Sequence, residues 1–171
     1  MKFAEHFDGP IAIRFARGVA FPEIKEDINL QYGKGQILKE GSKDGNNAGG
    51  NVAIIAVGSM VEETYKAIDM LEKENVHPAF VNPVFIKPMD TELIKRVAEN
   101  HKHIIVVEEG IKKGGFGESV ETFILESGID ADVQVMAIDD RFVEQGNVAL
   151  LREEIGISYK NIYEKVMELT R

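Results

Sequence analysis

The sequence contains no cysteine, and this absence excludes several kinds of chemistry at once. Without thiols the chain has no cysteine nucleophile, no zinc site built on cysteine ligands and no disulfide framework. A domain of this size does not need such cross-links, because its fold buries roughly 70% of the surface that the unfolded chain exposes. The length of 171 residues therefore predicts about one domain, held together by an apolar core.

Basic residues are also in deficit, since 20 lysines and arginines are outnumbered by 29 aspartates and glutamates, for a net charge of −9. This balance argues against binding to nucleic acid or to an anionic membrane surface. No apolar run approaches the ~20 residues that span a bilayer, and residues 1–6 lack the apolar core of a signal peptide. We expect a soluble, cytoplasmic protein with no nucleic-acid or membrane partner.

Short apolar segments alternate with helical patterns along the chain. The run from Val52 to Val57 is apolar without alternation, which is typical of a strand buried on both faces of a parallel sheet. The alternation predicts an α/β fold with three layers: a mainly parallel sheet with helices on both faces. Strands are expected at residues 11–15, 35–39, 52–57, 78–82, 103–107 and 133–137, and helices after residues 59, 88 and 117 and near residues 145–155 and 158–169.

Ligands of such folds bind at the carboxyl ends of the strands, so the residues that follow each strand are the candidates for a site. Ser59 precedes Glu62 by three residues, which predicts a capping box at the start of a helix. Glu108 and Glu109 end a buried strand, and neighbouring side chains of an extended chain point to opposite faces. They therefore cannot act as a pair on one substrate atom; one of them is functional, or both are structural.

Two arginines and a glycine loop are candidate anion sites. Arg14 and Arg17 flank the end of the first predicted strand, where a guanidinium can bind a phosphate or carboxylate through two hydrogen bonds. The alternative is that both are solvated charges or ion-pair partners. The loop of residues 114–117 could bind phosphate at the start of a helix, but Glu118 occupies the place of an anion. The alternative is close backbone packing against a neighbouring domain. No complete catalytic constellation is present, which fits a domain that contributes contacts to a site built elsewhere.

Several short motifs follow one another over nearly the whole chain. They are GPIAIRFARG at residues 9–18, GKG at 33–35, VGSMV at 57–61, VNPVFIKPMD at 81–90, VEE at 107–109, GGFG at 114–117 and DRFVEQG at 140–146. As an ordered set they resemble the C-terminal portion of the 1-deoxy-D-xylulose-5-phosphate synthase family, which ends in a transketolase C-terminal domain. The resemblance implies that residues 1–32 are the end of a pyrimidine-binding domain with its linker, and that residues 33–171 are the transketolase C-terminal domain.

The resemblance implies a homodimeric transferase of the non-mevalonate route of isoprenoid biosynthesis, which joins pyruvate to D-glyceraldehyde 3-phosphate and releases carbon dioxide. In that family thiamine diphosphate and Mg²⁺ are held by the N-terminal and pyrimidine-binding domains, which this chain lacks. We therefore expect a C-terminal fragment or split gene product that is inactive alone. We expect it to bind neither the cofactor nor a metal by itself, and to support the packing of the domains and of the dimer.

One family contact carries over to this sequence. Arg17 matches the second arginine of the family motif Arg-Tyr-Pro-Arg-Gly, which binds the phosphate of glyceraldehyde 3-phosphate, and Arg14 matches the first. The resemblance thus implies substrate binding by Arg17 and Arg14. The sequence departs from the motif at Phe15 and Ala16, and the loss of the proline loosens the loop.

Two other interpretations remain open. The β subunit of a 2-oxo acid dehydrogenase E1 shares this C-terminal domain, although residues 14–18 and 140–146 favour the synthase. A non-catalytic interaction or regulatory module of the same fold is the alternative from another class of protein.

Overall fold

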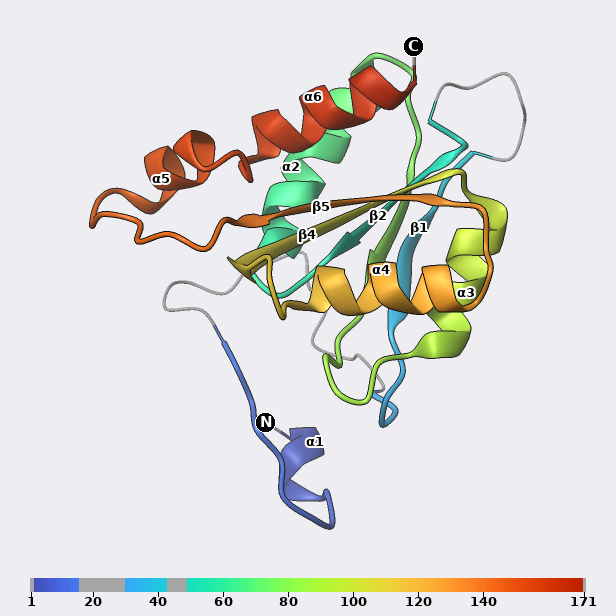
Figure 1. The fold of residues 1–171 in the computed structure, drawn as a ribbon, viewed down its shortest axis with the longest axis vertical. Helices are drawn as coiled ribbons and strands as arrows, with labels where there is room; N and C mark the ends of the chain where they lie inside the picture. The colour runs from blue at the N-terminus through green and yellow to red at the C-terminus, as the bar shows by residue number, and fades with distance from the viewer. Residues whose placement is uncertain (1, 16–29, 43–48, 171) are drawn as a thin grey trace.

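The sheet has five strands in the order β1-β3-β2-β4-β5, and the computed structural model describes residues 2–15, 30–42 and 49–170. Neighbouring strands run parallel from β3 through β2 and β4 to β5, whereas β1 is antiparallel to β3 at one edge (Figure 1). The elements are α1 (Lys2–Glu5), β1 (Gln36–Glu40), β2 (Val52–Ala56), α2 (Met60–Lys73), β3 (Ala79–Asn82), α3 (Thr91–Asn100), β4 (His103–Ile111), α4 (Phe116–Glu126), β5 (Asp132–Ile138), α5 (Val148–Glu154) and α6 (Tyr159–Leu169).

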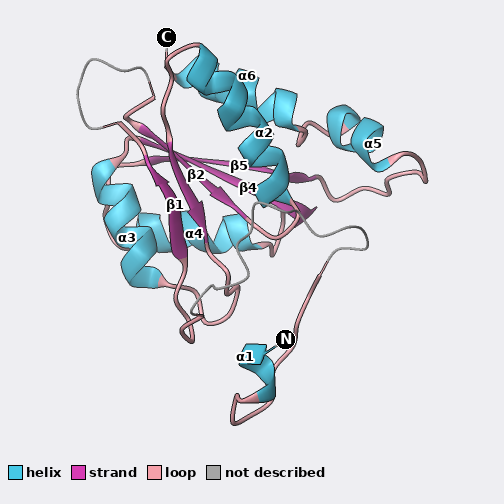
Figure 2. Cartoon of the chain, turned by 180° about the vertical axis from the view of Figure 1, so that it is seen from behind, coloured by secondary structure: helices cyan, strands magenta, loops and turns pink. Residues whose placement is uncertain are grey.

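Helices cover both faces of this sheet, which confirms the predicted three-layer architecture (Figure 2). The central strand β2 is buried along its whole length, and its alternate residues enter two separate apolar clusters. Val52, Ile54 and Ala56 pack with α2 and α6, whereas Ala53 and Ile55 pack with α3 and α4. Both faces of β2 therefore need apolar side chains, and this is the physical reason for its uninterrupted apolar run.

The predicted strand at residues 11–15 is wrong. These residues belong to no helix or sheet, and Phe15 is 75% exposed. A strand is stabilised by backbone hydrogen bonds to a neighbour, and none of the described strands lies beside this segment. An apolar run by itself therefore did not identify a strand here.

The capping box predicted at Ser59 is also wrong. Ser59 precedes the first residue of α2, but its side chain makes no capping hydrogen bond. The Ser59 hydroxyl instead donates to the Glu109 carboxylate at the end of β4. A charged acceptor on another element has replaced the local backbone partner.

The N-terminal residues pack through aromatic rings. Phe3 and Phe7 contact Phe85 and Tyr32, with ring centroids 5.0–5.9 Å apart among these side chains. The short helix α1 itself lies away from the sheet (Figure 1). Among the described residues no helix combines the length and the apolar character that crossing a membrane requires.

Candidate functional site

The first candidate, Glu108, lies on the α4 face of the sheet. Its side chain is only 6% exposed. Oε1 accepts a hydrogen bond from the Gly117 amide at 2.8 Å, and Oε2 accepts one from the Phe116 amide at 3.1 Å. A carboxylate is stabilised in this position because the first amides of a helix carry partial positive charge and have no partner within the helix.

This contact decides the role of the glycine loop. The start of α4 is where the sequence allowed a phosphate site. Its first amides are instead bonded to the Glu108 carboxylate. The loop also packs closely: a Cβ on Gly117 would lie 2.4 Å from Val135 Cγ1, and one on Gly115 would lie 2.5 Å from Glu108 Oε1. Residues 114–117 therefore serve the packing of α4 against β4 and β5, whereas their packing against a neighbouring domain stays a prediction.

Glu109 points to the opposite face, as its neighbour position on the strand predicts. Arg152 of α5 donates to its carboxylate twice, from Nε to Oε1 at 3.0 Å and from Nη2 to Oε2 at 3.1 Å. The Ser59 hydroxyl donates to Oε2 at 2.6 Å. Such a two-point contact between planar groups is the strongest geometry that an arginine and a carboxylate can form.

The same arginine extends the network to α2 and α6. Arg152 Nη1 donates to Glu63 Oε1 at 3.4 Å, and Glu63 Oε2 accepts from the Tyr159 amide at 2.9 Å. Glu63 is 6% exposed, so its charge needs these partners. The helix α5 has no buried residue, and Arg152 is therefore its principal polar connection to the rest of the domain.

Burial and ionic contacts shift the pKa values of Glu109 and Arg152 in opposite directions. Burial alone would raise the pKa of the Glu109 carboxyl, but the hydrogen bonds from Arg152 and Ser59 and the charges of Arg152 and Arg14 outweigh burial and lower it. Burial alone would lower the pKa of Arg152, whereas its contacts with Glu109 and the nearby Glu63 raise it. Glu109 and Arg152 thus hold each other in the charged state.

Arg14 joins this network from the N-terminal segment. Its Nη2 donates to the backbone oxygen of Glu109 at 3.0 Å. Arg14 therefore lies beside the carboxyl end of β4, at a residue 95 positions later in the sequence. Arg17, the other arginine of the predicted substrate contact, lies outside the described residues.

Sequence reasoning found Glu109, Arg14 and Ser59 but not the residues that join them. Arg152 and Glu63 stand in ordinary amphipathic helices, and no local motif marks either one. Only the packing of α5 and α2 at the same end of the sheet brings them together.

The described residues do not fit a diphosphate with a bound metal ion. No group of three histidine, aspartate or glutamate side chains in that part of the chain could hold a cation. The glycine-rich helix start is filled by Glu108, as described above. No step of a cofactor reaction can be derived from these residues.

Comparison with known proteins agrees with this architecture. Residues 39–162 match the family model described as transketolase, C-terminal domain. The chain is 36% identical to the 1-deoxy-D-xylulose-5-phosphate synthase of Alkaliphilus oremlandii (strain OhILAs) over 97% of its own length, and 34% identical to that of Heliobacterium modesticaldum (strain ATCC 51547 / Ice1) over 99%. It spans only 26% and 25% of the lengths of these two relatives.

A solved structure has the same fold over nearly the whole chain. It is described as a split gene transketolase in an inactive beta4 tetramer, and it superposes with a TM-score of 0.83 at 28% sequence identity. The match covers 99% of this chain and 53% of that one. The chain belongs to the transketolase C-terminal domain family, and it is homologous to the C-terminal region of 1-deoxy-D-xylulose-5-phosphate synthases.

Proposed function

We propose that this chain is the C-terminal part of a cytoplasmic, thiamine-diphosphate- and Mg²⁺-dependent 1-deoxy-D-xylulose-5-phosphate synthase. The two relatives named above are synthases rather than dehydrogenase subunits, and their similarity extends over nearly the whole chain. The small share of each relative that is covered agrees with N-terminal and pyrimidine-binding domains on a separate or longer polypeptide. In this proposal residues 1–32 end the pyrimidine-binding domain and residues 33–171 form the C-terminal domain.

The observation that carries the proposal is the hydrogen bond from Arg14 to the Glu109 backbone oxygen. Through this bond Arg14 lies at the carboxyl end of the parallel sheet, where ligands of such folds bind. Arg17 follows three positions later, and we assign it as the ligand of the phosphate of glyceraldehyde 3-phosphate. We assign Arg14 as the second substrate arginine; one of its guanidinium nitrogens is already held by the Glu109 backbone oxygen.

The remaining chemistry belongs to the partner domains. Among the described residues, Glu108 and Glu109 were the candidate catalytic carboxylates. Both are already hydrogen-bonded to other residues of the fold. The chain alone should therefore not turn over substrate, and its contribution is domain packing, dimer support and the phosphate arginines. The structural relative described as an inactive tetramer supports this expectation of inactivity.

The test is product formation from pyruvate and glyceraldehyde 3-phosphate with thiamine diphosphate and Mg²⁺. The chain is assayed alone and then together with the upstream domains. We expect activity only in the second mixture. Activity in neither mixture, with both parts folded and associated, would contradict the synthase assignment and favour the dehydrogenase subunit or the non-catalytic module.

In the active mixture, Arg17→Ala tests the substrate contact. We expect the KM for glyceraldehyde 3-phosphate to rise by about tenfold or more while the KM for pyruvate changes little, because only the first substrate carries a phosphate. The matched control is Arg96→Ala, which removes an exposed arginine of α3 and should change neither constant. Equal changes in both KM values would remove Arg17 from the phosphate site.

A further inference from the structure

Two arginines share one glutamate at the carboxyl end of β4. Arg152 donates twice to the Glu109 carboxylate, at 3.0 and 3.1 Å, whereas Arg14 donates to the backbone oxygen of the same residue at 3.0 Å. Among the described residues, Arg14 forms no ion pair with a carboxylate. Glu109 is therefore divided between them, its side chain held by Arg152 and its backbone by Arg14.

This division leaves the charge of Arg14 available to a ligand. The side chain is exposed, and its described hydrogen bond engages one nitrogen, Nη2. A guanidinium carries five N–H donors in a fixed plane, so donors remain for a second partner. An arginine that is held at one nitrogen and still charged suits the planar, two-point binding of a phosphate group.

Arg14 and the Glu109 carboxylate nevertheless attract each other. Burial raises the pKa of the Glu109 carboxyl, but the hydrogen bonds from Arg152 and Ser59, together with the charges of Arg152 and Arg14, lower it. Arg14 therefore lies close enough for its charge to act on this carboxylate. Arg152 and Ser59 place three donors on the two carboxylate oxygens, and these contacts occupy the side chain in place of Arg14.

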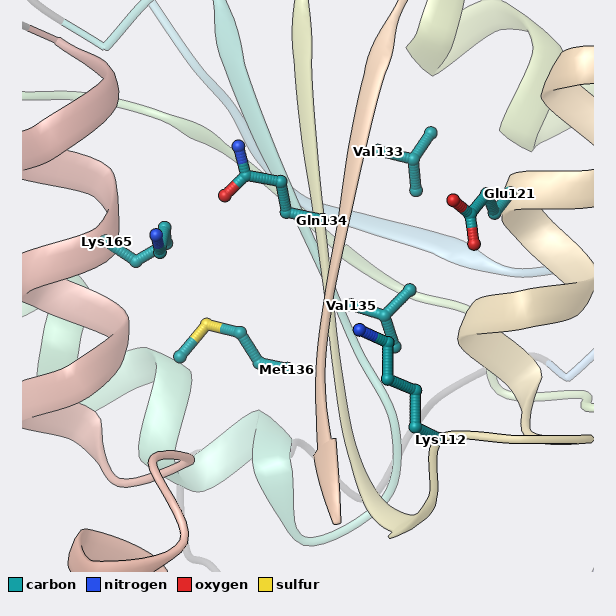
Figure 3. A pocket seen from close by; sticks show the side chains of 7 residues that line it. All are labelled: Lys112, Glu121, Val133, Gln134, Val135, Met136 and Lys165. Atoms are coloured by element: carbon teal, nitrogen blue, oxygen red, sulfur yellow. The ribbon is translucent and has the colours of Figure 1, made fainter. Parts of the chain in front are cut away.

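The groove beside β5 is a separate feature of the molecule. It has a volume of about 330 Å³ and lies between α4 and α6, with Lys112 and Lys165 in its lining (Figure 3). None of the residues bonded to Glu109 lines it, and Lys165 is paired with Glu168 at 2.6 Å. The lysines of the groove therefore take no part in the contacts of Arg14.

We propose that Arg152 is a positioning residue, which holds the Glu109 carboxylate and thereby keeps the Arg14 guanidinium free for the phosphate of the substrate. Without Arg152, the carboxylate and the phosphate compete for Arg14, because each is an anion that binds a guanidinium at two points. The identity of the substrate rests on the proposed function. The division of Glu109 between the two arginines does not, and the chain alone tests it.

The first experiment follows the arginine Nε–H signals of the isolated chain by nuclear magnetic resonance, with the heavy nitrogen isotope in its arginines. The Arg14 signal is the one that Arg14→Lys removes. In Arg152→Met, Arg14 should turn to the Glu109 carboxylate, so its signal should shift and its exchange with solvent should slow by about fivefold or more. The double variant Arg152→Met with Glu109→Gln should restore the wild-type signal, because the competing charge is gone.

The second experiment measures KM values in the active mixture with the upstream domains. Arg152→Met should raise the KM for glyceraldehyde 3-phosphate about fivefold and leave that for pyruvate nearly unchanged. The double variant with Glu109→Gln should return it to within about twofold of the wild-type value. Glu63 loses its arginine in both variants, so this comparison isolates Glu109. Arg152→Lys keeps the charge without the two-point contact and should raise the KM less, which provides a second variant if Arg152→Met does not fold.

The matched control is Lys160→Met. Lys160 pairs with Glu153 of α5 at 2.9 Å and has no contact with Glu109, so the change removes another cation that holds α5. It should leave both KM values unchanged. If Arg152 served only to dock α5, Glu109→Gln would not rescue the Arg152→Met variant, since α5 would remain undocked.

Three results would overturn the inference. One is an Arg14 signal that is the same in the wild type and in a folded Arg152→Met chain. The others are a KM for glyceraldehyde 3-phosphate that Arg152→Met leaves unchanged, and one that the double variant fails to restore. An inactive wild-type mixture contradicts the proposed function and with it the substrate named here, whereas the division of Glu109 is decided by the first experiment.

Discussion

Glu108 and Glu109 are neighbours at the end of β4, yet the two faces of the sheet use them in different ways. Glu108 is buried against α4 and accepts hydrogen bonds from two backbone amides. Glu109 is only partly buried and is bonded to the side chains of Arg152 and Ser59. One carboxylate closes a helix end, whereas the other joins separate elements through charge.

The difference shows how a single strand end can be rigid on one face and adjustable on the other. Backbone amides cannot move away from Glu108 without unwinding the start of α4. Side-chain partners can rotate, so the Glu109 face can accept a further contact, and its backbone oxygen does accept one from Arg14. We therefore expect the Glu108 face to determine stability and the Glu109 face to determine the docking of α5 and of the N-terminal segment.

The largest expected effect comes from the same isosteric change made at both positions. Glu108→Gln places an amide N–H₂ against a backbone N–H in a buried site, and the free energy of unfolding should fall by about 3 kcal/mol. Glu109→Gln should cost only about 1 kcal/mol, since its surroundings are partly solvated and can rearrange. Urea unfolding at neutral pH measures both. Equal losses at the two positions would remove the distinction between the faces.

A smaller effect is expected from Arg152→Met, which keeps the length of the side chain but removes its charge. Glu109 and Glu63 then lose their shared cation, and the free energy of unfolding should fall by about 2 kcal/mol. Hydrogen exchange should accelerate in α5 more than in the remaining helices, because α5 has no buried residue to hold it. The control Arg96→Met changes an exposed arginine of α3 and should leave both measurements unchanged.

The smallest expected effect is the pH dependence of the stability that Glu109 contributes. The pKa of Glu109 is lower in the folded chain than its ordinary value of 4.5, so folding favours the ionised form. Its contribution to stability is fully present above that value and is lost as the pH falls through the folded pKa. The difference of about 1 kcal/mol between wild type and Glu109→Gln should therefore be present at pH 7 and shrink below about pH 4.5.

The matched control for this pH dependence is Glu126→Gln, on the exposed surface of α4. It should leave the unfolding curves unchanged at both pH values. A stability difference for Glu109→Gln that persists undiminished in strong acid would show that the ionic contacts with Arg152 and Ser59 are not its cause.

Much of the fold could be predicted because its signals are local. The apolar run at residues 52–57 corresponds to β2, and the predicted strand at 103–107 corresponds to the first part of β4. The predicted helix near 158–169 corresponds to α6, whose first turn is closed by Ser158 and Asn161. Residues 11–15 show the limit of this reasoning, because a strand also needs a neighbour that a local pattern does not supply.

The candidate site was predicted only in part. The alternation of side chains along a strand was enough to separate Glu108 from Glu109, and this prediction is confirmed by their different partners. The partners themselves could not be predicted, since Ser59 follows the rule for a helix cap yet bonds to Glu109. The assignment of Arg17 and Arg14 to substrate phosphate stays a prediction.

The sequence by itself determined the layered α/β fold, the buried central strand and the opposite directions of the two glutamates. These follow from periodicity, which depends only on the geometry of one segment at a time. The tertiary structure decided that Arg152, Glu63 and Arg14 meet around Glu109, and that β5 is the last strand in the sheet order. Such contacts join residues far apart in the chain, and only the packing of whole elements brings them within the few ångströms over which hydrogen bonds act.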